Sequence, residues 1–173
     1  MAALRDPDEN TRAEAAFIVA GVPWSPEQHV RVRTALIAKL VDPIMMVRRA
    51  ALRGIGLLGS AAVGNAAASD PAAMAVGRLL ADPDPQVRQD AAIALGQLRD
   101  PRSAPVLIRA IDSGDEIFVS RSMLAALVNL PGADVDTALL RMLDTPPRGL
   151  TTRSVSETLR HRPSPNPKFV AAL

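Results

Sequence analysis

The sequence lacks cysteine and tyrosine, and its aromatic residues are one tryptophan and three phenylalanines among 173 residues. Without cysteine, the chain cannot form disulfides, cysteine-ligated zinc or iron–sulfur sites, or a thiol nucleophile. The two histidines, His29 and His161, are too far apart to form a metal-binding pair on one helix. The shortage of aromatic rings also leaves few side chains on which a nucleic-acid base could stack.

Long apolar runs are absent as well. No uninterrupted stretch approaches the roughly 20 apolar residues that span a bilayer. The first residues also lack the basic and apolar regions of a signal peptide. We therefore expect a cytoplasmic protein that does not act at a membrane.

Charge is present but unevenly distributed. Lysine and arginine outnumber aspartate and glutamate by 20 to 18, which gives a formal net charge of only +2. Residues 28–53 carry six cations and one aspartate, and residues 148–173 carry five cations and one glutamate. The rest of the chain is acidic, so the sequence predicts two local basic patches rather than a basic protein.

One short sequence motif, here called the repeated phrase, occurs three times along the chain. An Asp-Pro pair is followed, six residues after the aspartate, by an arginine and then by alanines. The aspartates and arginines of the three copies are Asp6 and Arg12, Asp42 and Arg48, and Asp82 and Arg88. The copies are separated by 36 and then 40 residues, a period typical of stacked helical pairs.

Capping residues followed by proline mark the expected helix starts, as at Ser25-Pro26, Asp42-Pro43 and Asp82-Pro83. We expect these polar side chains to accept hydrogen bonds from free N–H groups of the first turn. Apolar residues recur at helical spacing between the marks. First helices are predicted at 8–21, 44–58, 84–98, 116–129 and 150–160, and second helices at 26–41, 70–81, 101–112 and 134–144.

The predicted fold is an all-α solenoid of about four to five stacked antiparallel helix pairs. Residues 1–161 form one helical domain and residues 162–173 a proline-rich tail, with a longer connection at 59–69. The fourth unit is irregular, because Ser120 replaces the arginine and residues 112–115 replace Asp-Pro. The chain begins within a repeat, so we expect self-association or a longer parent chain to cover one end of the stack.

The repeated phrase resembles the HEAT repeat, in particular the short bacterial HEAT-like repeats found in phycobilin lyases. Residues 82–96 match the pattern of Asp-Pro, Val-Arg, paired alanines and Leu-Gly almost completely. The resemblance implies that the repeated acids and arginines form a ladder of side-chain bonds between neighbouring repeats. This ladder comprises Asp6, Arg12, Asp42, Arg48, Asp82 and Arg88.

No constellation of residues suggests an enzyme. Residues 54–59 spell Gly-x-Gly-x-x-Gly, but this motif follows a predicted helix instead of a strand, so dinucleotide binding is not indicated. No Gly-x-Ser-x-Gly motif is present to position a serine nucleophile. We therefore predict a protein without catalytic residues, bound metal or cofactor.

The favoured function is a protein-interaction scaffold that uses a concave face lined by second helices. Its expected partner is an acidic protein, because the candidate polar contacts on these helices are arginines. Trp24 is a candidate aromatic anchor or, alternatively, seals the first repeat. The candidate partner-binding residues are Trp24, Arg31, Arg33, Arg78, Arg102 and Arg109.

Two alternatives remain open from the sequence. One is nucleic-acid binding, as in HEAT-like alkylpurine DNA glycosylases, through the basic patch Arg31, Arg33, Lys39, Arg48, Arg49 and Arg53. The scarcity of aromatic residues argues against this alternative. The other is a subunit of a bilin lyase or isomerase, which only the repeat subtype suggests.

Overall fold

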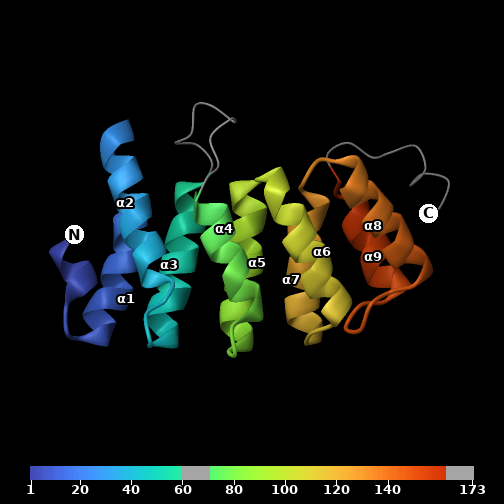
Figure 1. Cartoon of the computed structure of the whole chain (residues 1–173), viewed down its shortest axis with the longest axis horizontal. Coiled ribbons are helices and arrows are strands. Elements are labelled where there is room, and N and C mark those ends of the chain that lie inside the picture. The colour runs from blue at the N-terminus through green and yellow to red at the C-terminus, as the bar shows by residue number, and fades with distance from the viewer. Residues whose placement is uncertain (60–70, 163–173) are drawn as a thin grey trace.

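A computed structural model describes residues 1–59 and 71–162, and these residues form helices without strands. Antiparallel helix pairs stand side by side in a single row (Figure 1). The first helices are α1 (Glu9–Ile18), α3 (Met45–Leu58), α5 (Pro85–Leu98) and α7 (Ile117–Val128). The second helices are α2 (Pro26–Lys39), α4 (Pro71–Arg78), α6 (Ala104–Ser113) and α8 (Ala133–Asp144), and α9 (Thr152–Leu159) follows.

Each predicted helix is present, and the α-solenoid is therefore confirmed as the fold. Several predicted helix ends are short 3-10 turns, as at Val19–Gly21, Leu79–Ala81 and Pro101–Ser103. The predicted connection at 59–69 and the predicted tail at 162–173 lie almost entirely outside the described residues. Within the described ranges, no helix has the length and hydropathy needed to cross a membrane.

The aspartates of the repeated phrase do not cap the helices, contrary to our expectation. Asp84 is the residue that caps α5, where its carboxylate accepts hydrogen bonds from two backbone N–H groups at 2.8 and 3.1 Å. Asp82 lies two residues earlier and accepts instead from the backbone N–H of Asp84, at 3.0 Å. Asp42 likewise accepts from the N–H of Ile44 in the turn before α3. The repeated aspartate therefore braces the turn and remains available to a neighbouring repeat.

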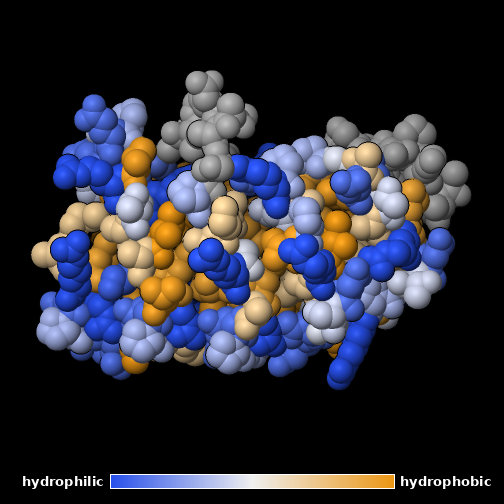
Figure 2. Space-filling model, viewed as in Figure 1, coloured by the Kyte–Doolittle hydropathy of each residue, from blue (hydrophilic) through white to orange (hydrophobic). Residues whose placement is uncertain are grey.

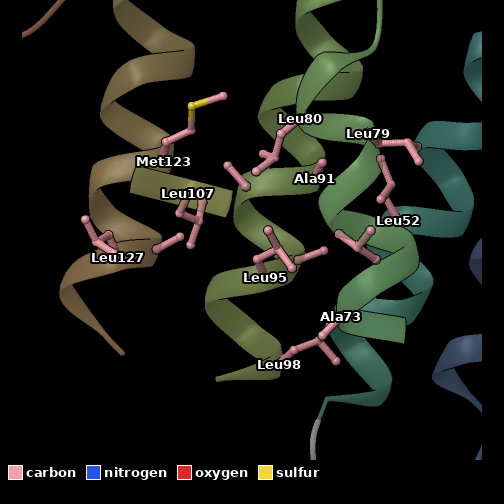
Figure 3. Close-up of a cluster of buried hydrophobic side chains, with 14 of the residues drawn as sticks. Leu52, Ala73, Leu79, Leu80, Ala91, Leu95, Leu98, Leu107, Met123 and Leu127 are labelled. Carbon is pink, nitrogen blue, oxygen red and sulfur yellow. The ribbon is translucent and has the colours of Figure 1, made fainter. Parts of the chain in front are cut away.

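The first helices pack closely on one another because small side chains line their contacts. A Cβ atom at Gly54 of α3 would lie only 2.8 Å from the backbone oxygen of Ala16 in α1. Leucines and alanines fill the space between first and second helices, and Figure 3 shows Leu95 of α5 and Leu107 of α6 among these buried side chains. This mode of packing explains a core with almost no aromatic residues.

The irregular fourth unit has a structural explanation. Ser120 of α7 is fully buried at the position that arginine occupies in the earlier first helices. The connection after α8 packs here, because a Cβ atom at Gly149 would lie 2.7 Å from both the Ser120 hydroxyl and the backbone oxygen of Asp115. Gly149 also has a φ of +86°, which favours glycine. The serine thus gives the connection room that an arginine would fill.

Candidate partner-binding face

Arginine side chains join the turns of successive repeats. Arg48 donates from Nε and Nη2 to the two carboxylate oxygens of Asp82, at 2.9 and 3.1 Å. Its Nη1 donates to the backbone oxygens of Asp42 and Pro43, at 2.9 and 3.1 Å, in the turn before its own helix. One guanidinium therefore holds two neighbouring turns in a fixed relation.

The same arrangement occurs in the repeats on either side of the Arg48–Asp82 pair. Arg12 donates to both carboxylate oxygens of Asp42, at 3.0 and 3.1 Å, and to the backbone oxygen of Asp6. Arg88 donates to both carboxylate oxygens of Asp115, each at 2.6 Å. The repeated phrase did not point to Asp115, although this residue, like Asp42, lies just before a first helix.

These contacts favour the ionised form of Asp115 and Asp42. Hydrogen bonds from Arg88 lower the pKa of the Asp115 carboxyl below its ordinary value, against the opposing effect of burial. Burial raises the pKa of Asp42, but hydrogen bonds from Arg12 and the N–H of Ile44 outweigh it, so the net shift is downward. The aspartates act as structural partners of the arginines.

Most of the basic patch predicted at residues 31–53 is engaged in similar pairs. Arg49 donates to Asp90 at 2.7 Å, and Arg53 lies 3.4 Å from the other oxygen of the same carboxylate. Lys39 lies 3.6 Å from Asp42, and Arg48 pairs with Asp82. Four of the six cations thus have an acidic partner, which weakens the positive field offered to a nucleic acid.

The exposed surfaces of α2, α4, α6 and α8 form one side of the stack, here called the second-helix face (Figure 1). Figure 2, drawn from the same side, shows apolar surface interrupted by hydrophilic residues. Adjacent second helices contact one another less extensively than adjacent first helices do. This looser packing leaves hollows between neighbouring helices, as at α4 and α6.

The hollow between α4 and α6, here called the α4–α6 pocket, has a volume of about 330 Å³. Arg78, Arg102 and Arg109 line it, so the structure brings together three of the six predicted partner-binding residues. The other lining residues are mostly small or apolar: Ala73, Met74, Gly77, Asp100, Ser103 and Val106. The pocket therefore combines an apolar surface with a concentration of arginine.

The remaining predicted contacts lie elsewhere. Arg31 is exposed on α2, away from the pocket. Arg33 differs from the expected exposed contact, since its side chain is buried and donates a hydrogen bond to the backbone oxygen of Gly59. Trp24 is half-buried against the core, and its indole N–H donates to the backbone oxygen of Val19 at 2.6 Å. This geometry favours the sealing role of Trp24 over the anchoring role.

Within residues 1–59 and 71–162, no group of three His, Asp or Glu side chains is arranged to hold a metal ion. His29 lies on α2 and His161 follows α9, at opposite ends of the row of helices.

Comparisons with protein families agree with the architecture. The model of the HEAT repeats matches residues 72–160. A model of the HEAT repeat associated with sister chromatid cohesion matches residues 28–52. A search of curated proteins finds no significant match.

Solved structures with similar folds include natural and designed repeat proteins. A chain from the complex of CpcE and CpcF of phycocyanin lyase from Nostoc sp. PCC7120 has a TM-score of 0.69 and 23% identity. That match covers 97% of this chain and 65% of the lyase chain, so this chain spans less than two thirds of it. The designed armadillo repeat protein YIII(Dq)4CqI has a TM-score of 0.62 and 16% identity, covering 99% and 85% of the two chains. At identities this low, the structural likeness shows a similar fold and nothing more.

Proposed function

Because the chain belongs to the HEAT repeat family, we propose that it is a non-catalytic scaffold that binds a partner protein through its second-helix face. The observation that carries this proposal is the α4–α6 pocket, where three arginines surround an apolar surface. Arginine and exposed apolar side chains are typical of protein-binding surfaces. An acidic partner surface is complementary to such a site.

Two arginines of the second-helix face remain unpaired among the described residues, beside apolar surface. Arg49 of α3 is paired with Asp90 of α5, so first helices use such charges to hold the stack together. On the second-helix face, Arg141 of α8 pairs with Asp112 of α6, whereas Arg78 and Arg109 are exposed and make no ion pair with another described residue. Unpaired arginines beside apolar surface remain available to a partner.

Nucleic-acid binding and bilin chemistry have weaker support. The basic patch that suggested nucleic-acid binding is largely neutralised by Asp42, Asp82 and Asp90. The likeness to a phycocyanin lyase chain is at 23% identity, which concerns the fold alone. We therefore favour the scaffold.

Site-specific photocrosslinking tests the proposed face. A benzoylphenylalanine at position 74 of α4 or position 31 of α2 is irradiated in extracts of the source organism. Matched probes replace Ile93 of α5 and Leu57 of α3, which are 44% and 58% exposed on first helices. We expect both second-helix probes to capture the same protein and the first-helix probes to capture none of it. Capture of one protein equally from both faces, or from neither, would overturn the proposal.

A further inference from the structure

We propose that the α4–α6 pocket binds an acidic side chain flanked by apolar residues in a segment of the partner protein. This inference rests on the proposed scaffold function and specifies the chemistry that its binding face recognises. It depends on three features of the pocket: an apolar surface, an excess of positive charge and a buried hydroxyl.

The apolar surface exists because small residues face one another across the two helices. Gly77 of α4 lies opposite Val106 of α6, and a Cβ atom at Gly77 would lie 3.3 Å from Cγ1 of Val106. Ala73 adds a second small side chain from α4, and Met74, which is 64% exposed, lies at the same pocket. Unbranched methionine adapts its shape to an apolar partner side chain. These residues give a partner's aliphatic groups a surface to bury.

The charge of the pocket is positive after its internal pairs are formed. Arg102 donates from Nε and Nη2 to the two oxygens of Asp100, at 2.9 and 2.6 Å. These hydrogen bonds lower the pKa of Asp100, so its carboxylate stays ionised. The negative charge of Asp100 then offsets the positive charge of Arg102. Arg78 and Arg109 have no such partner among the described residues and supply the excess positive charge. A planar guanidinium binds a carboxylate through two parallel hydrogen bonds.

A buried hydroxyl provides the third feature. Ser103 lines the pocket, only 2% of it is exposed, and its hydroxyl has no hydrogen-bond partner among the described residues. Buried polar groups are nearly always hydrogen-bonded, so a lone hydroxyl beside a pocket indicates a missing partner. A carboxylate oxygen in the pocket would supply an acceptor once the Ser103 side chain turns toward it, because the hydroxyl oxygen is closed to solvent in this conformation.

The pocket also opens toward neighbouring hollows that can hold the residues next to the acid. Arg109 lines the α4–α6 pocket and a groove of about 570 Å³ between α6 and α8. Ile108, Pro131 and Val135 contribute apolar side chains to that groove. A partner segment can therefore place its carboxylate near Arg109 and an adjacent apolar side chain against α8. A free carboxylate would occupy only the first of these spaces.

Amide chemical-shift titration of the whole chain tests the assignment. The probe is the acetylated tripeptide amide Leu-Glu-Leu, and its matched control is Leu-Gln-Leu, which has the same shape without the charge. We expect the glutamyl peptide to shift the amides of Gly77 and Val106 and to bind at least tenfold more tightly than the glutaminyl peptide. Equal affinity for the two peptides would overturn the inference. Hexanoate that binds as tightly as the glutamyl peptide would overturn the choice of a protein segment over a free carboxylate.

Variants separate this inference from the scaffold proposal. The double variant Arg78→Met and Arg109→Met should bind the glutamyl peptide at least tenfold more weakly. Ser103→Ala should also lower the affinity for this peptide, without lowering the stability of the protein. Arg121→Met, an exposed arginine on α7, is the control and should leave affinity unchanged. Unchanged peptide affinity in the double variant would overturn the inference. If the crosslinked partner also binds the double variant normally, only the pocket assignment fails and the scaffold stands.

Discussion

The Arg48–Asp82 pair allows a direct test of how successive repeats are held together. Arg48→Met keeps most of the aliphatic side chain but removes the guanidinium, and with it four hydrogen bonds to the two flanking turns. The side chain of Asp82 is only 8% exposed, so its carboxylate would be left charged, largely buried and without its main partner.

The expected loss of stability follows from this geometry. Removing one member of a buried ion pair costs about 3–5 kcal/mol, whereas surface pairs contribute at most about 1 kcal/mol. The Arg48 side chain is 13% exposed, so water can partly replace the hydrogen bonds that Asp82 loses. We therefore expect Arg48→Met to lower the free energy of unfolding by about 3 kcal/mol. In a double-mutant cycle with Asp82→Ala, we expect a coupling of about 2 kcal/mol.

Urea unfolding with two probes measures both the loss and its location. Trp24, the single tryptophan, reports on the first repeat by fluorescence, and circular dichroism reports on all helices. In Arg48→Met the fluorescence midpoint should fall below the circular dichroism midpoint. Without the Arg48–Asp82 pair, the first two repeats are less tightly coupled to the third and unfold at lower urea concentration. Arg153→Met, which removes an exposed pair with Glu157, is the control and should leave both midpoints unchanged. A loss below about 1 kcal/mol with coincident midpoints would refute the reasoning.

Three further predictions follow from the same structure. Gly54→Ala should destabilise the protein by about 1–3 kcal/mol in urea unfolding although alanine favours helices, because the new Cβ would lie 2.8 Å from a backbone oxygen. Gly21→Ala is the control and should be nearly neutral, because a Cβ there would have nothing within 4 Å. A larger loss of stability in Gly21→Ala than in Gly54→Ala would contradict the packing. Because the pKa of Asp115 is lowered in the folded state, its pair with Arg88 stabilises the fold above the ordinary value of 3.8 and loses that contribution as pH falls through the folded pKa. The melting temperature of Arg88→Met should therefore fall less steeply with falling pH than that of the unmodified chain. Identical slopes of melting temperature against pH would contradict this prediction. Fluorescence anisotropy with duplex DNA at low salt should show no binding, whereas affinity that falls steeply with salt would favour the nucleic-acid alternative.

The sequence allowed the helices to be predicted because local signals determine them. Ser25 and Pro26 occupy the cap and first position of α2, as their order along the chain indicates. The exact role of the Asp-Pro aspartates was not predictable, since a cap and a brace of the preceding turn use the same residue type. Asp82 is such a brace, and the cap two residues later is another aspartate, Asp84.

Features that depend on distances between repeats were harder to predict. The partner of Arg88 is Asp115, in a turn without Asp-Pro, and only its place just before α7 marks it. The α4–α6 pocket depends on how far apart two second helices stand, which no motif encodes. Its three arginines were predicted from their helices, but the buried Ser103 was not, because its burial results from packing.

Hydrogen exchange of the protein with and without its crosslinked partner tests the central claim most directly. The account predicts that the partner slows amide exchange in Pro71–Arg78 and Ala104–Ser113, the α4 and α6 segments, and leaves Pro85–Leu98 of α5 unchanged. Protection confined to α5 and the other first helices, with α4 and α6 unaffected, would contradict it.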